Sequence, residues 1–249
     1  MKTKIVLLTI GLLSLAFVRI NAKGQENANV ILSKIDQTMF GAKDKSANVK
    51  MVMINLKNGK QKVKEATLLQ KGANKKLFRY IYPKSDSGIA TLSLPDNQVY
   101  LYLPLFKKPK KITNLAQNNS FNKSDFSFQD MATKSYSEKY TSQLTGTTDT
   151  SYVLKLKPKD ENSTYSYLMA TINKTHYYFD KIEYYNQKGQ KVKVAVYHFK
   201  KVDNYWIADV VSMTDLKKNH RTTIKMSNIK INQGLKDDLF TLKNLAGAQ

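Results

Sequence analysis

The sequence predicts a mainly β protein built on one large, curled antiparallel sheet or on a barrel. From residue 49 onward, short runs rich in Val, Ile, Thr, Tyr and Phe alternate with a period close to two, as β-strands do. Tight-turn residues such as Asn58-Gly59 and Asp203-Asn204 separate these runs. About ten strands in succession, joined by such turns, favour one curled sheet or a barrel.

The first 22 residues have the pattern of a secretory signal peptide. A positively charged start precedes an apolar run over residues 5–18, and Ala22 suits a cleavage site. The run is too short, and too soon followed by Arg19, to be a good membrane span. We therefore expect an exported, soluble protein of the periplasm. Its mature part, residues 23–249, is long enough for one sizeable core and is expected to form a single domain.

An N-terminal helix is expected before the strands. Residues 26–40 place apolar side chains at i, i+3 and i+4 spacing, which predicts one amphipathic helix. Gly41 stands where a C′ capping glycine belongs. Strands are expected over residues 49–56, 62–70, 77–82, 88–94, 98–103, 152–157, 166–172, 178–185, 190–199, 205–213 and 221–231. Hairpin turns are expected at residues 58–59, 186–189, 203–204 and 217–220.

The stretch from residue 77 to residue 131 is the centre of the predicted fold. Its strand at 99–103 is apolar or aromatic on both faces, so both faces need cover. Helices are one candidate cover, and an apolar ligand is the other. Residues 104–131 predict a lid across one face of the sheet, with Ser127 capping a short helical turn that contains Asp130.

Composition narrows the possible partners. The chain has no Cys, which excludes disulfides, thiolate metal sites and the lipid-modified Cys of a lipoprotein. The formal net charge of +22 attracts anionic surfaces, whether phosphate headgroups, glycolipids or nucleic acid. The lysines are spread along the chain, however, and no helix-turn-helix, RNA-binding or zinc-module pattern is present. We expect a solvated basic surface and no nucleic-acid partner.

Catalytic motifs are not evident in the sequence. His176, His198 and His220 lack the spacing of a metal site, and no nucleophile or phosphate-binding motif is present. Asp125 and Asp130 are candidate acid–base carboxylates. Their i, i+5 spacing and their position near a helix start favour a structural, capping role instead. We expect a protein that is not an enzyme and has no cofactor or metal.

Several sequence blocks carry a family resemblance. They are VYLYLP at 99–104, KKI at 110–112 and SFNKSDFSFQD at 120–130, with YW at 205–206, MTD at 213–215 and LFT at 239–241. Together they resemble the outer-membrane lipoprotein-sorting family, the LolA-like periplasmic lipoprotein carriers. Asn122 and Lys123 stand where that family usually has Met-Gly, and Gln129 stands where Glu is common.

The resemblance implies an incomplete antiparallel β-barrel closed by an N-terminal helix and a helical lid, with a hydrophobic cavity for acyl chains. It implies a monomeric carrier of lipoproteins, or of another lipid, from an inner-membrane export permease to an outer-membrane acceptor. Expected acyl-chain contacts in the cavity or lid are Tyr80, Tyr82, Leu92, Leu94, Tyr100, Tyr102, Phe106, Phe121, Phe126 and Phe128. The alternation leaves open whether Tyr100 and Tyr102, or Val99, Leu101 and Leu103, point inward.

Two other functions fit the sequence. One is a non-catalytic envelope scaffold that binds a partner protein and fills its core with its own side chains. The other is a hydrolase that uses Asp125 or Asp130. The basic segment at 107–111 is either a contact for anionic headgroups or a solvated loop.

Overall fold

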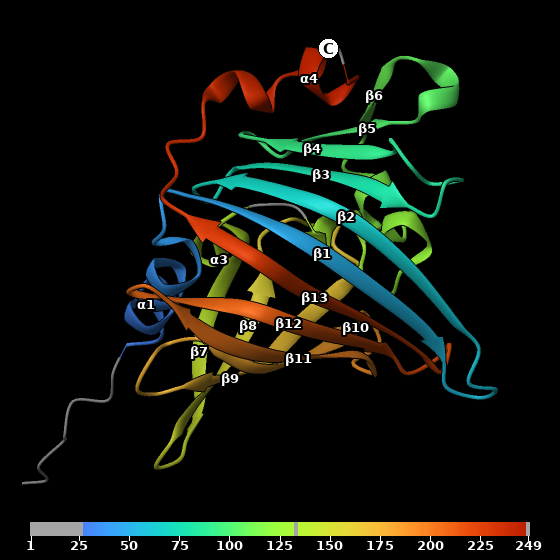
Figure 1. Ribbon diagram of the computed structural model, residues 1–249. Coiled ribbons are helices and arrows are strands. Elements are labelled where there is room, and N and C mark those ends of the chain that lie inside the picture. The colour runs from blue at the N-terminus through green and yellow to red at the C-terminus, as the bar shows by residue number, and fades with distance from the viewer. Residues whose placement is uncertain (1–26, 132–133, 248–249) are drawn as a thin grey trace, which may run out of the picture.

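One open antiparallel sheet of 13 strands forms the frame of the molecule (Figure 1). The computed structural model describes residues 27–131 and 134–247, so the predicted signal peptide lies outside the described residues. The strands are β1 (Asp44–Asn55), β2 (Gln61–Lys71), β3 (Lys75–Tyr82), β4 (Ala90–Leu94), β5 (Gln98–Tyr102), β6 (Pro109–Ile112), β7 (Tyr140–Thr147), β8 (Ser151–Pro158), β9 (Tyr165–Asn173), β10 (Phe179–Asn186), β11 (Lys191–Val202), β12 (Tyr205–Asp215) and β13 (His220–Ile231). The predicted mainly β, incomplete-barrel fold is confirmed.

The strand order follows from two runs of hairpins. In space the order is β6-β5-β4-β3-β2-β1-β13-β12-β11-β10-β9-β8-β7. The first strand pairs with the last, and this antiparallel β1–β13 pair joins the two halves of the sheet. The two edge strands, β6 and β7, are consecutive in sequence. The chain between them therefore has to pass from one edge of the curled sheet to the other.

Turns at the predicted positions and β-bulges shape the sheet. Gly59 and Gly189 have φ angles of +70° and +71°, and Asp203 and Asn219 are also left-handed, at the four predicted hairpin turns. Register shifts interrupt several strand pairs, for example between Ser46 and Asn48 in β1. Such bulges increase local twist and bend the strands, which contributes to the curl seen in Figure 1.

All eleven expected strands are present, together with two strands that were not predicted. The missed strands, β6 and β7, are the two edges of the sheet. Pro109 begins β6, and β7 is largely polar, with Gly146 in its interior. Edge strands tolerate such residues because one of their sides carries no ladder partner. Their composition therefore gives little strand signal.

The predicted N-terminal helix is confirmed as α1 (Ala28–Phe40), which packs on β7 and β12. Asn27 caps it by accepting a hydrogen bond from the Asn29 amide at 2.8 Å. The predicted role of Gly41 is wrong, because its φ of −66° is not left-handed. A Cβ at Gly41 would lie 2.4 Å from the Gln37 carbonyl oxygen, so close backbone approach is what requires glycine there.

Short helices complete the fold. They are η1 (Pro104–Phe106), η2 (Leu115–Asn118), η3 (Phe121–Lys123), α2 (Phe128–Met131), α3 (Tyr136–Lys139), η4 (Asp237–Phe240) and α4 (Leu242–Leu245). Among the described residues, no helix has the length and apolar character needed to cross a lipid bilayer.

Each face of the sheet carries its own apolar cluster. The larger cluster lies on the concave face, where α1 and the chain between β6 and β7 pack on strands of both halves. The smaller cluster lies on the outer face of β3–β5, under η4 and α4 (Figure 1). Ala90 and Leu92 of β4 belong to the smaller cluster, while Val99 of the neighbouring β5 belongs to the larger. Both faces of this region are therefore covered, as the sequence predicts.

Candidate functional site

The chain between the two edge strands forms a lid inside the curl of the sheet. This lid segment, residues 113–131 and 134–139, contains η2, η3, α2 and α3. In α2 the Ser127 and Asp130 side chains each accept a hydrogen bond from the other residue's amide, at 3.0 and 2.8 Å. This reciprocal capping box confirms the predicted helical turn. The predicted lid over 104–131 is wrong in its first part, because residues 109–112 extend the sheet as β6.

Three phenylalanines of the lid segment, here called the aromatic plug, fill the concave interior: Phe121, Phe126 and Phe128. All three are buried in the larger apolar cluster. The Phe121 ring meets the rings of Phe78 and Phe128 edge-on, with centroids 5.4 and 5.3 Å apart. Edge-on aromatic pairs add about 0.5–1.5 kcal/mol beyond the burial of their area. The plug therefore holds the lid segment against β3.

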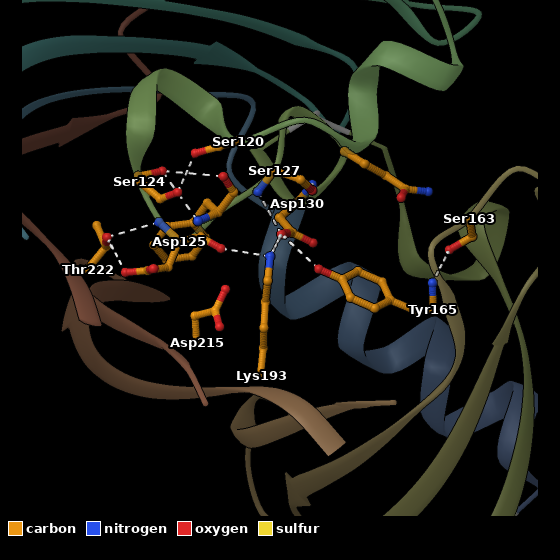
Figure 2. A network of polar contacts seen from close by, with 12 residues as sticks. Ser120, Ser124, Asp125, Ser127, Asp130, Ser163, Tyr165, Lys193, Asp215 and Thr222 are labelled. Atoms are coloured by element: carbon orange, nitrogen blue, oxygen red, sulfur yellow. Dashed lines mark hydrogen bonds and ion pairs between the residues drawn. The ribbon is translucent and has the colours of Figure 1, made fainter. Parts of the chain in front are cut away.

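Asp125 fixes the lid segment to β13 (Figure 2). Its buried carboxylate accepts a hydrogen bond from the Thr222 hydroxyl at 2.7 Å and lies 2.7 Å from Nδ1 of His220. The Asp125 amide donates to Thr222 Oγ1 at 3.0 Å, and the Lys193 ammonium donates to the Asp125 carbonyl at 2.8 Å. Charge-assisted bonds of this kind are about twice as strong as neutral ones. Asp125 does not cap a helix; its contacts link the lid segment to β11 and β13.

Asp130 makes a second polar link beside the first. Its Oδ2 lies 3.4 Å from the Tyr165 hydroxyl and 3.7 Å from the Lys193 ammonium (Figure 2). Burial, and the negative charge of Asp130, raise the pKa of Tyr165 well above its ordinary value. Tyr165 therefore stays protonated and donates to the carboxylate. Both carboxylates of the proposed hydrolase are engaged in holding the lid segment.

A cavity of about 170 Å³ lies under the lid segment. Its walls come from α1, β1, β2, β3, the lid segment, β11, β12 and β13. The apolar lining is Met39, Phe40, Val49, Leu68, Phe78, Phe126, Met131, Tyr136, Tyr197, Ala208, Val211, Ile224 and Met226. The polar lining is Lys45, Gln70, Lys76, Asp130, Lys134 and Lys139.

A second cavity, of about 450 Å³, lies at the β5–β6 edge. Apolar side chains of β5, β6 and η1 line it together with Lys108, Lys110 and Lys111. Leu105 and Phe106 beside it are 84% and 66% exposed. The predicted basic segment thus borders an apolar hollow at the edge of the sheet.

Four of the ten predicted contact residues lie on the concave side. Tyr80 and the three residues of the aromatic plug belong to the larger cluster, and Phe126 lines the cavity. Tyr82 is 53% exposed, because a register shift opposite Glu65 and Ala66 interrupts the alternation after Tyr80. Phe106 is exposed at the second cavity.

The other four predicted contacts lie on the outer face. Leu92, Leu94, Tyr100 and Tyr102 pack in the smaller cluster with Phe240 and Leu245. The C-terminal segment covers that face of β3–β5, so the structure places these four side chains away from the cavity under the lid segment. Val99 and Leu101 pack in the concave cluster, so these residues of β5 point inward, and Tyr100 and Tyr102 point outward. The sequence predicted that an apolar ligand could cover one face of this region. In the structure, segments of the chain itself pack on both faces.

The polar lining of the cavity was not predicted from the sequence. Lys76 is in phase with Phe78 and Tyr80 along β3, and Lys45 is in phase with Ala47 and Val49 along β1. Period-two alternation therefore carried the signal that these lysines share the apolar face. It was obscured by the many lysines at solvent-facing positions.

The histidines make pairwise contacts. His198 Nδ1 lies 2.6 Å from Asp209, His220 contacts Asp125, and the His176 ring packs on Trp206 with centroids 4.5 Å apart. Within residues 27–131 and 134–247, no three His, Asp or Glu side chains gather as a metal site would require.

Comparison with solved structures defines the class of protein. A domain from Vibrio parahaemolyticus, described as a candidate outer membrane lipoprotein-sorting protein, is 25% identical, with a TM-score of 0.80 over 88% of this chain and 98% of its own. A LolA superfamily protein from Nitrosomonas europaea is 23% identical, with a TM-score of 0.73 over 87% and 98%. A DUF1329 family protein from Desulfovibrio piger is 21% identical, with a TM-score of 0.81 over 87% and 97%.

The protein is therefore LolA-like, and its resemblance to the lipoprotein-sorting proteins is confirmed. Residues 72–247 match a family model whose description is only "uncharacterized protein", and the chain belongs to that family. No curated protein matches the chain.

Proposed function

We propose that this protein is a periplasmic carrier that binds the acyl chains of lipoproteins, or of another lipid, and moves them toward the outer membrane. The observation that carries the proposal is the cavity of about 170 Å³, lined mostly by apolar side chains and partly covered by the lid segment. The LolA-like fold supports it, as does the description of the Vibrio relative as a lipoprotein-sorting protein.

The size of the cavity indicates how cargo would bind. Ligand sites for small molecules usually measure about 300–1,000 Å³, so the cavity of about 170 Å³ holds too little space for a long acyl chain. Cargo would displace the aromatic plug and cover the same wall of the sheet. Each buried CH₂ contributes about 0.8 kcal/mol, so the chain would offset the lost burial of the plug. The apolar wall then stays covered in both states.

The edges of the sheet support a monomeric carrier. β6 has only four residues, begins with Pro109 and carries Lys110 and Lys111, while β7 is packed against α1 and α3. Short, charged or covered edges resist pairing with another chain. An inner-membrane export permease and an outer-membrane acceptor are the partners that this function requires.

Substitution of one residue in the wall of the sheet that cargo would cover tests the proposal. Val211→Glu places a charge on the cavity wall, whereas Val196→Glu alters an exposed valine of the neighbouring strand. Val211→Glu should weaken binding of a fluorescent fatty acid at least about ten-fold, and Val196→Glu should not. Circular dichroism checks that both variants are folded. Equal binding by both folded variants would contradict the carrier.

The alternative is a non-catalytic envelope scaffold with a self-filled core, and the buried aromatic plug is the observation that favours it. Mass spectrometry of lipids that co-purify with the protein from its native envelope separates the two. A carrier yields bound acyl lipid in stoichiometric amounts, and a scaffold yields none.

A further inference from the structure

A row of polar side chains crosses the concave face beside the cavity. Lys45 on β1 lies opposite Gln70 on β2, Gln70 lies opposite Lys76 on β3, and Lys76 lies opposite Ser93 on β4. Side chains directly opposite on neighbouring antiparallel strands share one face, with Cβ atoms about 4.5–5.5 Å apart. Two lysines therefore flank one glutamine, and all three side chains line the cavity.

The lid segment brings further positive charge to the same cavity. Lys134 and Lys139 line it from the lid side, and Asp130 is the only carboxylate among the lining residues. The Asp130 carboxylate already accepts from the Ser127 amide and contacts Tyr165 and Lys193. We call Lys45, Lys76, Lys134 and Lys139 the lysine cluster.

The contacts of Lys76 and Gln70 leave room for an anion. Lys76 donates to the Met131 carbonyl, and the Gln70 amide donates to the Gly72 carbonyl at 3.0 Å. An ammonium has three donors and a side-chain amide has two, so one carbonyl saturates neither group. A half-buried positive charge is most stable when an anion is paired with it. Burial lowers the pKa of Lys45 and Lys139 to about 8, and burial with repulsion from Lys139 and Lys45 lowers that of Lys76 to about 7.

We propose that the lysine cluster binds the anionic headgroup, a carboxylate or a phosphate, of a lipid whose chain lies in the cavity. The inference rests on the proposed carrier function and narrows its cargo to anionic amphiphiles. Lys45, Lys76 and the Gln70 amide supply donors to such an oxyanion, and charge-assisted bonds are the strongest of their kind.

Binding of an anion is then linked to protonation. The titratable side chains that line the cavity with Lys76 are Lys45, Asp130, Lys134, Tyr136, Lys139 and Tyr197. Burial raises the pKa of Tyr136 and of Tyr197 well above their ordinary values, so both stay neutral. An anion favours the charged lysines, and binding near pH 8 should therefore take up protons.

Calorimetric titration of the purified, delipidated protein with three single-chain probes tests the inference. The probes are dodecanoate, dodecyl phosphate and dodecanol, which share a chain and differ in headgroup. At pH 6.5 at least one anionic probe should bind about ten-fold tighter than dodecanol. The double variant Lys45→Met/Lys76→Met should lose this preference and keep its affinity for dodecanol. Lys107→Met/Lys110→Met removes the same charge from the basic segment and should keep the preference.

The outcomes separate the two proposals. Equal affinity for all three probes would overturn the headgroup site while leaving the carrier intact. Absence of binding by any probe would overturn the carrier and, with it, the headgroup site. The relative affinity of carboxylate and phosphate identifies the headgroup. Titration at pH 8 in buffers of different ionisation enthalpy should give net proton uptake by the wild type, and less by the double variant. A preference that survives in a folded double variant would also contradict the site.

Discussion

The two faces of the sheet are covered by different segments of one chain, and the covers differ in what they enclose. On the outer face, Phe240 and Leu245 of the C-terminal segment are 4% and 0% exposed against Leu77, Ala90 and Leu92. On the concave face, the lid segment encloses a cavity and the lysine cluster. One cover completes a core, whereas the other leaves a cavity beside the aromatic plug.

A buried aspartate helps to hold each cover, but in a different way. The Asp44 carboxylate accepts hydrogen bonds from the backbone amides of Gln233, Gly234 and Leu235 at 2.7, 2.8 and 3.0 Å. Asp125 instead depends on two side chains of β13. The proposed carrier function requires the concave cover to open for cargo, whereas it requires no movement of the outer cover.

Truncation of the outer cover should give the largest effect. Phe240→Ala removes a buried ring and should lower the free energy of unfolding by about 3–5 kcal/mol in urea titrations. Leu242→Ala, a control at an exposed position of the adjoining α4, should stay within about 0.5 kcal/mol. Affinity for a fluorescent fatty acid should be unchanged in folded Phe240→Ala. Loss of that affinity would show that the outer cover takes part in binding.

Neutralising the aspartate of the lid segment should give a smaller loss of stability and a change in kinetics. Asp125→Asn weakens the contacts with Thr222 and His220 and should cost about 1.5–3 kcal/mol. Stopped-flow fluorescence should show faster association of a fatty acid, because the lid segment opens more often. Asp149→Asn, at an exposed position, serves as the control. Slower or unchanged association would contradict an opening lid.

The lysine cluster makes the stability of the ligand-free protein depend on pH. The pKa of Lys76 falls from its ordinary value of 10.5 in the unfolded chain to about 7 in the folded protein. Between these values the unfolded chain binds more protons, so the free energy of unfolding should rise with pH. Lys76→Met should flatten this rise in urea titrations from pH 6.5 to 9.5, and Lys107→Met should not. A profile identical in Lys76→Met and wild type would place Lys76 in a more solvated position.

Substitution of the two exposed residues among the predicted acyl-chain contacts should have the smallest effect on the free energy of unfolding. Tyr82→Ala and Phe106→Ala remove side chains that are 53% and 66% exposed. Their free energies of unfolding should stay within about 0.5 kcal/mol of the wild type. A drop of several kcal/mol in denaturant titrations would instead assign these two side chains to the core.

Most strands, their turns and the lid could be predicted from the sequence, because alternation and turn chemistry are local signals. The edge strands could not, since Pro109 and the polar residues of β7 are poor strand formers. The sequence also did not show which face of the sheet Leu92 and Tyr100 occupy, because Ala90–Leu94 is buried on both sides. That assignment depends on Phe240 and Leu245, which lie more than a hundred residues away in sequence. The lysine cluster could be recognised only from the strand register of the structure, which places Lys45, Gln70 and Lys76 in one row.

Amide hydrogen exchange with and without dodecanoate tests the difference between the two covers most directly. Exchange within residues 113–131 and 134–139 should change on addition of the fatty acid, whereas exchange within residues 235–247 should stay the same. An equal response of both segments, or no response of the lid segment at saturating fatty acid, would contradict a removable concave cover.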